Sequence, residues 1–201
     1  MWAEKFVTFS KVLRWGFVGL MVATAVIILF ILSGVNDPKP NGELVVELGV
    51  FPQIVAPQAP RITWLEESIP AEDYSVRLTA VQDAGETGRG MDVGYGLVLG
   101  DDDVHVAVAV SPLGYLSVWQ EADGEVQVIF PWQTWPHVGR DLVENEIWVD
   151  VDNSDQLTIR INREFLWEGE IEPVSGQVGV IAESFGETAI VDFQKLEMFV
   201  E

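Results

Sequence analysis

The sequence predicts an all-β domain, an antiparallel sandwich of two sheets, that follows one N-terminal transmembrane helix. Two patterns predict the sandwich. Apolar residues alternate with polar ones along several short stretches after residue 62, and turn-forming stretches such as "GDDD", "SPLG" and "EADGE" recur roughly every eight to twelve residues. A third pattern, a long apolar run near the N-terminus, predicts the helix.

The predicted helix is the run from Trp15 to Val35, twenty-one residues without a charge. At ~1.5 Å per residue it spans ~30 Å, the thickness of the hydrocarbon core of a bilayer. Lys5, Lys11 and Arg14 precede the run and acidic residues follow it, so the positive-inside rule places the N-terminus in the cytoplasm. The apolar core of a cleaved signal peptide has only ~7–15 residues. We therefore predict a single-pass signal anchor in the cell membrane.

This assignment divides the chain into four parts. Residues 1–14 form a cytoplasmic N-terminus, residues 15–35 the membrane helix, residues 36–61 a proline-rich tether, and residues 62–201 the extracytoplasmic domain. Within the tether, residues 43–50 are apolar enough to form a short first strand.

Composition excludes several classes of function. The chain carries 32 Asp and Glu against 11 Lys and Arg, a net charge of −21, which repels nucleic acid and favours cations or basic partners. The simpler interpretation is that surface acids keep an external domain soluble. The sequence has no cysteine, so disulfides, thiolate catalysis and cysteine-ligated metals are excluded. A hydrophobic core alone must hold the domain together.

Four stretches of the domain alternate most clearly, with the period of two that is typical of a strand with one buried face. Their apolar positions are Tyr74, Val76, Leu78, Ala80, Val104, Val106, Val108, Val110, Ile147, Val149, Val151, Leu157, Ile159 and Ile161.

Longer motifs carry a resemblance to a known family. In order, "YGLVLGDDD", "GYLSVWQEADGE", "IFPWQTW", the hairpin around "INREF" and "GQVGVIAESFGETAIVDF" resemble the concanavalin A-like (laminin-G/glucanase-type) jelly roll. Within that group the chain is most similar to bacterial extracytoplasmic 3-keto-disaccharide hydrolase-like domains, over roughly residues 64–200. The resemblance implies a jelly-roll sandwich with a concave face often used for glycans, and frequent membrane anchoring. His105 and Val106 replace the family's aromatic pair, and Arg163 replaces its hairpin glycine.

Three consecutive acids, Asp101, Asp102 and Asp103, stand between two apolar stretches. We interpret them as a hairpin turn, because aspartate side chains bond nearby backbone amides in turns. Calcium needs six to eight oxygens, most of which would have to come from other loops, so a calcium site here is the weaker alternative. No other cofactor is expected.

Aromatic residues are better candidates for contacts with a ligand or partner. Trp132, Trp135 and His137 stand together in "FPWQTWPHV", and exposed indole rings stack on sugars or anchor protein partners. Trp132 matches a family tryptophan and is expected to pack into the sandwich edge, whereas Trp135 is extra to the family pattern and is the preferred contact residue. Trp148 alternates with aliphatic residues, so it lines either the concave face or a second core layer.

The membrane helix has a face of small residues, Gly16, Gly19 and Ala23, which would let another helix approach closely. Glycine is common in membrane helices, so chance explains this spacing equally well.

Together these patterns predict a non-enzymatic, membrane-anchored extracytoplasmic domain that binds a glycan or a protein. One version of this hypothesis makes it an accessory subunit of a membrane complex. The alternative is a glycan hydrolase or lyase acting on cell-surface polysaccharide, which needs two carboxyl groups ~5–9.5 Å apart. The E-x-D-x-x-E strand of the glucanase-type jelly rolls does not occur in this sequence.

Overall fold

The computed structural model forms two units, Met1–Lys39 and Pro40–Glu201, which are described separately. The residues that the structure describes are 2–33, 37–40, 42–57, 60–70, 72–83, 92–152, 156–171 and 176–201.

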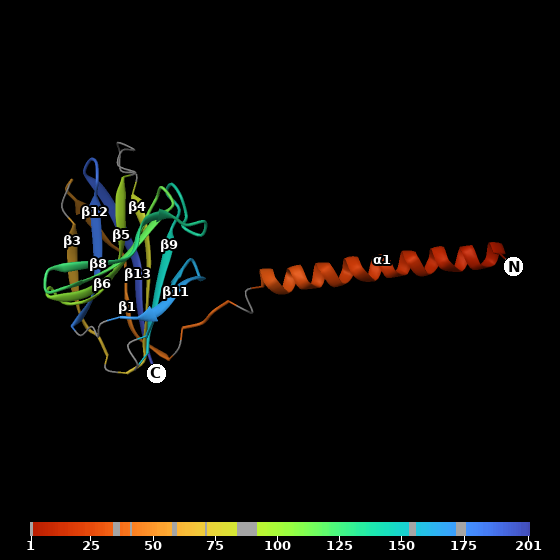
Figure 1. Cartoon of the computed structure of the whole chain (residues 1–201), viewed down its shortest axis with the longest axis horizontal. Coiled ribbons are helices and arrows are strands. Elements are labelled where there is room, and N and C mark those ends of the chain that lie inside the picture. Colours follow the sequence, from red (N-terminus) through yellow and green to blue (C-terminus); the bar gives the residue numbers. More distant parts are fainter. Residues whose placement is uncertain are drawn as a thin grey trace. The chain divides into compact units, whose positions relative to one another are not determined.

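The first unit is one long helix, α1 (Trp2–Leu32) (Figure 1). Its segment Arg14–Leu32 has 19 residues with a mean hydropathy of 2.6, long and apolar enough to cross a membrane or to serve as a signal sequence. The Thr24 hydroxyl donates to the Leu20 carbonyl at 2.9 Å, so this polar group is satisfied within the helix. The membrane run predicted from the sequence ends at residue 35, three residues beyond the end of α1. Residues 34–36 lie outside the described residues.

The second unit is built of strands. In its described part they are β1 (Glu43–Leu48), β2 (Phe51–Val55), β3 (Arg61–Ser68), β4 (Tyr74–Asp83), β5 (Val93–Gly100), β6 (Val104–Ser111), β7 (Tyr115–Ala122), β8 (Glu125–Thr134), β9 (Asn145–Val151), β10 (Gln156–Ile161), β11 (Glu164–Glu170), β12 (Gln177–Ser184) and β13 (Ala189–Val200).

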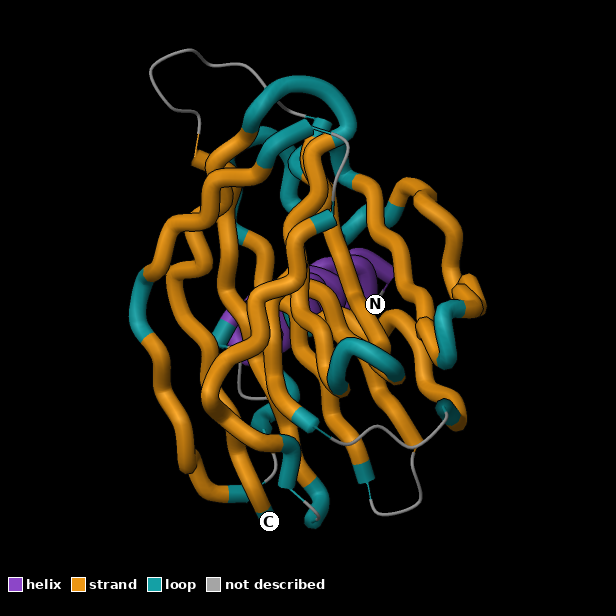
Figure 2. Tube along the Cα trace, turned by 90° about the vertical axis from the view of Figure 1, so that its left-hand side faces the viewer, coloured by secondary structure: helices purple, strands orange, loops and turns teal. Residues whose placement is uncertain are grey.

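These strands form two antiparallel sheets. Sheet A has the order β1-β13-β4-β9-β10-β11, with β2 also paired to β13, and sheet B has the order β3-β12-β5-β6-β7-β8. Figure 2 shows the strands running side by side, with the loops gathered at the two ends of the sandwich. The predicted fold class, an antiparallel two-sheet jelly-roll sandwich with one N-terminal apolar helix, is confirmed.

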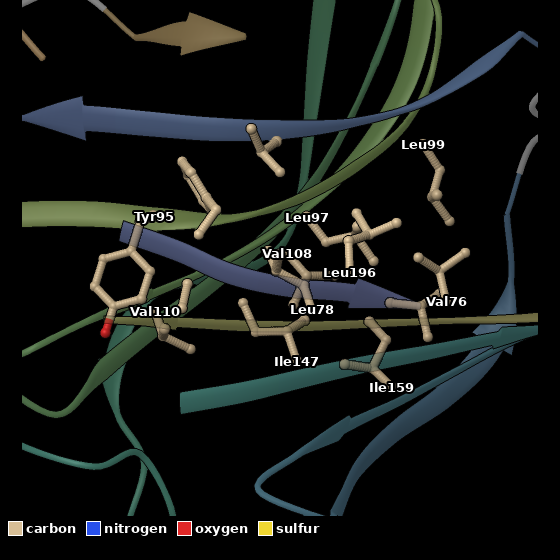
Figure 3. Packing of buried hydrophobic residues seen from close by; sticks show 14 of the residues in the cluster. Val76, Leu78, Tyr95, Leu97, Leu99, Val108, Val110, Ile147, Ile159 and Leu196 are labelled. Carbon is tan, nitrogen blue, oxygen red and sulfur yellow. The ribbon is translucent and has the colours of Figure 1, made fainter. Parts of the chain in front are cut away.

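The core lies between the inner faces of the two sheets. Leu78 and Ile147 of sheet A point toward Leu97 and Val108 of sheet B (Figure 3). Each of these side chains is at most 2% exposed, and burial of one such side chain stabilises the fold by about 1.5–3 kcal/mol. Because side chains alternate along a strand, their sequence neighbours point to the outer faces of the two sheets.

The sandwich begins earlier than the sequence indicated. The predicted first strand is present as β1, but β2 also pairs with β13, so residues 43–55 belong to sheet A rather than to a separate tether. Pro52 has no N–H to donate, and it is tolerated in β2 because this strand pairs with a single neighbour.

One buried polar group closes an end of the core. Asn145 is fully buried, and its amide nitrogen donates to the Tyr95 hydroxyl at 3.0 Å and to the Gly139 carbonyl at 3.3 Å. Its amide oxygen accepts from the Gly139 N–H at 2.7 Å and from Asn162 at 3.0 Å. Asn145 therefore joins sheets A and B and holds the loop after β8 against the sandwich.

Tyr95 makes the stability of this end sensitive to alkaline pH. Burial raises the pKa of the Tyr95 phenol from 10.0 to about 12, and the hydrogen bond from Asn145 offsets part of this rise. A raised pKa in the folded state gives a contribution that is complete below pH 10 and is lost as the pH rises toward 12. We expect the free energy of unfolding to fall across this window. Chemical denaturation of Tyr95→Phe should show a shallower fall, and equal slopes would contradict the assignment.

Candidate functional site

The three aspartates form the turn between β5 and β6, as predicted. The Asp101 carboxylate accepts from the amides of Val104 and Asp103 at 2.8 and 2.9 Å, and these bonds lower the pKa of Asp101. Asp102 accepts from the Trp64 indole N–H at 2.8 Å. Among the described residues, no group of three or more His, Asp or Glu side chains is placed to hold a metal ion. The turn is thus built from protein donors, with two of the carboxylates already engaged.

Trp148 lies on the outer face of sheet A but is only 1% exposed. The Arg77 guanidinium lies 4.2 Å from its ring centroid and that of Arg160 5.4 Å, and both interactions are of the cation–π type. Its indole N–H donates to Asp150 at 2.6 Å, and Asp150 also pairs with Arg160. Trp148 is therefore part of a second buried layer, and its assignment as a ligand contact is wrong because other side chains cover it.

The outer face of sheet B is also partly covered. Trp64 lies against Gly179 and contacts the ring of His105 in a T-shaped arrangement, with 6.1 Å between the ring centroids. Several outward-facing apolar residues outside the main core are at most 4% exposed. They are Val98, Ala107, Ala109 and Ile181. This part of the face is filled by the chain's own side chains and leaves a ligand little access.

The same face is open at the end where β5 begins. A hollow of about 210 Å³ is lined there by Asp92, Ser111, Leu113, Tyr115, Trp132 and Phe185, which we call the aromatic hollow. Trp132 is 37% exposed, Tyr115 39% and Phe185 49%, so their rings are available to a ligand. The lining residues come from four places in the sequence, at residues 92, 111–115, 132 and 185.

The backbone around Gly94 positions Trp132. A Cβ atom at Gly94 would lie 2.8 Å from the Trp132 ring, so only glycine lets the indole lie across β5. Phe185 packs edge-to-face on Trp132, with 5.7 Å between ring centroids and an angle of 86° between the planes. The Phe185 amide donates to the Asp92 carbonyl at 2.8 Å, which places these two residues side by side. The rings are thus held by packing and by a backbone hydrogen bond.

The hollow combines apolar surface with a few polar groups. Aromatic rings can stack on the apolar face of a sugar, while polar groups orient its hydroxyls. The Asp92 carboxylate and the Tyr115 hydroxyl supply acceptors, and the Ser111 hydroxyl accepts from the Leu113 amide at 3.3 Å. Such a surface suits the binding of a sugar ring.

The structure separates Trp135 from Trp132. Trp135 is partly buried, packs against the core cluster, and its indole nitrogen is buried with no hydrogen-bond partner. His137 is exposed, and its ring lies 5.9 Å from that of Trp135. The order that the sequence suggested is therefore reversed: Trp132 is the exposed ring in the hollow, and Trp135 is the ring that packs inside.

Comparison with known proteins identifies the fold. No family model matches the chain, and no curated protein matches it. Among solved structures, the carbohydrate binding module CBM66 from Bacillus subtilis matches with a TM-score of 0.52 and 12% identity, over 77% of this chain and 97% of that one. The second unit has a lectin-type jelly-roll fold.

Two further structures match at the same level. The Emp47p carbohydrate recognition domain matches with a TM-score of 0.50 and 16% identity, over 82% of this chain and 89% of that one. The binding domain of botulinum neurotoxin DC, solved in complex with rat synaptotagmin II, has a TM-score of 0.50 and 7% identity, over 80% and 42% of the two chains. At such identities the likeness concerns the fold alone.

Of the six residues that line the aromatic hollow, sequence reasoning named only Trp132. Tyr115 and Phe185 each adjoin a turn, in "SPLGYL" and "ESFGE", and Asp92 precedes β5. An aromatic residue beside a turn is a usable signal, because turns lie at the surface. Tyr115 and Phe185 are 70 positions apart in the sequence, and strand order in a sheet does not follow sequence order. The sequence therefore does not show that they line the same hollow.

Proposed function

We propose that this protein is a membrane-anchored recognition domain that binds glycans outside the cell membrane through the aromatic hollow. The observation that carries this proposal is the gathering of Tyr115, Trp132 and Phe185, all more than a third exposed, around one hollow on sheet B. Isolated exposed apolar residues are ordinary, whereas a contiguous group with polar neighbours marks a binding surface. A lectin-type fold supports a glycan as the ligand.

The anchor in this proposal is the apolar segment Arg14–Leu32, with the N-terminus in the cytoplasm and the jelly roll outside. We also propose that, among jelly-roll domains, this one is most similar to bacterial 3-keto-disaccharide hydrolase-like domains. A further part of the proposal is that the protein is an accessory subunit of a membrane complex. The small residues Gly16, Gly19 and Ala23 on one face of α1 would let another helix approach closely.

A glycan array tests the proposed function. The full chain, solubilised in mild detergent, should be retained by a subset of glycans and should release no new reducing ends from them during prolonged incubation. Steady release of reducing ends would support the alternative, a hydrolase or lyase. Retention by no glycan, with another protein copurifying at fixed stoichiometry, would overturn the glycan proposal in favour of a protein partner.

A further inference from the structure

The charged residue in the lining of the aromatic hollow is acidic. Asp92 is the charged residue in the lining, and its carboxylate lies near Gly186, where a Cβ atom would be 3.5 Å from it. The described lining contains no Lys or Arg. Arg140 lies against Gly114 in the β6–β7 turn, beside the rim, and the chain as a whole carries −21 charges. A ligand in the hollow therefore experiences a negative potential.

A second carboxylate lies next to the hollow. Glu183 in β12 is paired in register with Gly94 in β5, on which Trp132 rests. Residues paired in this way have Cβ atoms about 5 Å apart, so Glu183 adjoins the Trp132 ring. Burial disfavours the ionised form of Glu183 and raises its pKa. A bound cation would stabilise that form.

The rings themselves favour a cation. The faces of Trp, Tyr and Phe rings attract positive charge, and this attraction strengthens when water is excluded. The same chain shows this on sheet A, where the Arg77 guanidinium lies 4.2 Å from the centroid of the buried Trp148 ring. In the hollow, three partly exposed rings carry no cation of the chain's own among the described contacts.

From these contacts we propose that the aromatic hollow selects sugars that carry an ammonium group, and that it disfavours sugars with carboxylate or sulfate groups. The ring of the amino sugar stacks on Trp132, and its ammonium group lies between the Asp92 carboxylate and the aromatic rings. The hollow, about 210 Å³, is smaller than the ~300–1,000 Å³ of sites for drug-sized ligands, so it holds one sugar ring. This inference rests on the proposed glycan-binding function and specifies its ligand.

Calorimetric titration of the full chain in detergent tests the charge selection. The probes are the β-1,4-linked disaccharide of glucosamine and its fully N-acetylated form, which share linkage and ring shape but differ in charge. We expect the amine form to bind about two- to fivefold more tightly, the effect of one ion pair near a surface. Asp92→Asn should remove this preference. Glu125→Gln deletes the same charge at the exposed start of β8 and should preserve the preference.

Each other outcome overturns the inference. Equal affinity for the two disaccharides, or tighter binding of the acetylated one, shows that charge does not select the ligand. An equal effect of Asp92→Asn and Glu125→Gln shows general attraction by an acidic protein. Binding of neither disaccharide, when the glycan array retains other glycans, rejects the amino-sugar ligand and leaves the proposed function intact. If the array retains the protein on no glycan, both the inference and the proposed function are contradicted.

Discussion

Replacement of Trp148 with alanine is expected to lower the free energy of unfolding by about 3–5 kcal/mol, the usual cost of truncating a buried tryptophan. Three losses combine at this position. The cavity exposes the outer face of β9, Arg77 and Arg160 lose the ring that they cover, and Asp150 loses the indole N–H bond of 2.6 Å. Urea denaturation of the full chain in detergent, followed by tryptophan fluorescence and circular dichroism, measures the change.

Trp148→Phe separates these losses. Phenylalanine keeps a ring between the two arginines but donates no hydrogen bond to Asp150, so we expect a smaller loss of about 1–2 kcal/mol. A change below about 1 kcal/mol for Trp148→Ala would mean that the outer layer of sheet A contributes little and that its burial is incidental.

Asn145→Ala is expected to cost about 2–4 kcal/mol. The substitution leaves the Gly139 N–H, the Gly139 carbonyl and the Tyr95 hydroxyl without the partner that Asn145 supplies at the end of the core, and a buried unsatisfied polar group costs about 1–3 kcal/mol. The loop after β8 should also loosen, because both the N–H and the carbonyl of Gly139 in this loop are hydrogen-bonded to Asn145. Hydrogen exchange at the Gly139 amide, together with urea denaturation, measures both effects.

Tyr95→Phe is the matched control. It removes one partner of Asn145 while keeping the ring in the core, so we expect a loss of only about 1 kcal/mol and no increase in exchange at Gly139. If the tyrosine variant is as unstable as Asn145→Ala, the bond between the two sheets is the important one, and the loop contacts of Asn145 are secondary.

Most of the fold could be predicted from the sequence, because each strand signals its buried face locally. The predicted alternating residues Tyr74–Ala80 and Val104–Val110 lie in β4 and β6, and all of their predicted inward-facing members except Val104 are in the core. The extent of the tether could not be predicted in the same way. Whether residues 51–55 form a strand depends on pairing with β13, more than 130 residues away.

The candidate site was harder to predict, because exposure of a tryptophan depends on neighbours from other strands. Trp132 is exposed in the hollow because Gly94 leaves room for its ring on β5, while Trp135, three residues later, packs against the core. Composition and spacing contain neither fact. Trp148 shows the same limit. Its position on the strand face opposite the aliphatic residues was predicted correctly, but the two arginines that cover its ring come from β4 and β10.

Comparing Trp132→Ala with the native chain on the same glycan array most directly tests the central claim that the aromatic hollow is the binding site. The variant is predicted to bind every glycan that the native chain retains at least about tenfold more weakly, the loss typical of an aromatic anchor, and to keep a melting temperature within a few degrees. Phe165→Ala removes a ring of similar exposure, 55%, from sheet A and should bind normally. Unchanged glycan binding by a folded Trp132→Ala chain would contradict the account.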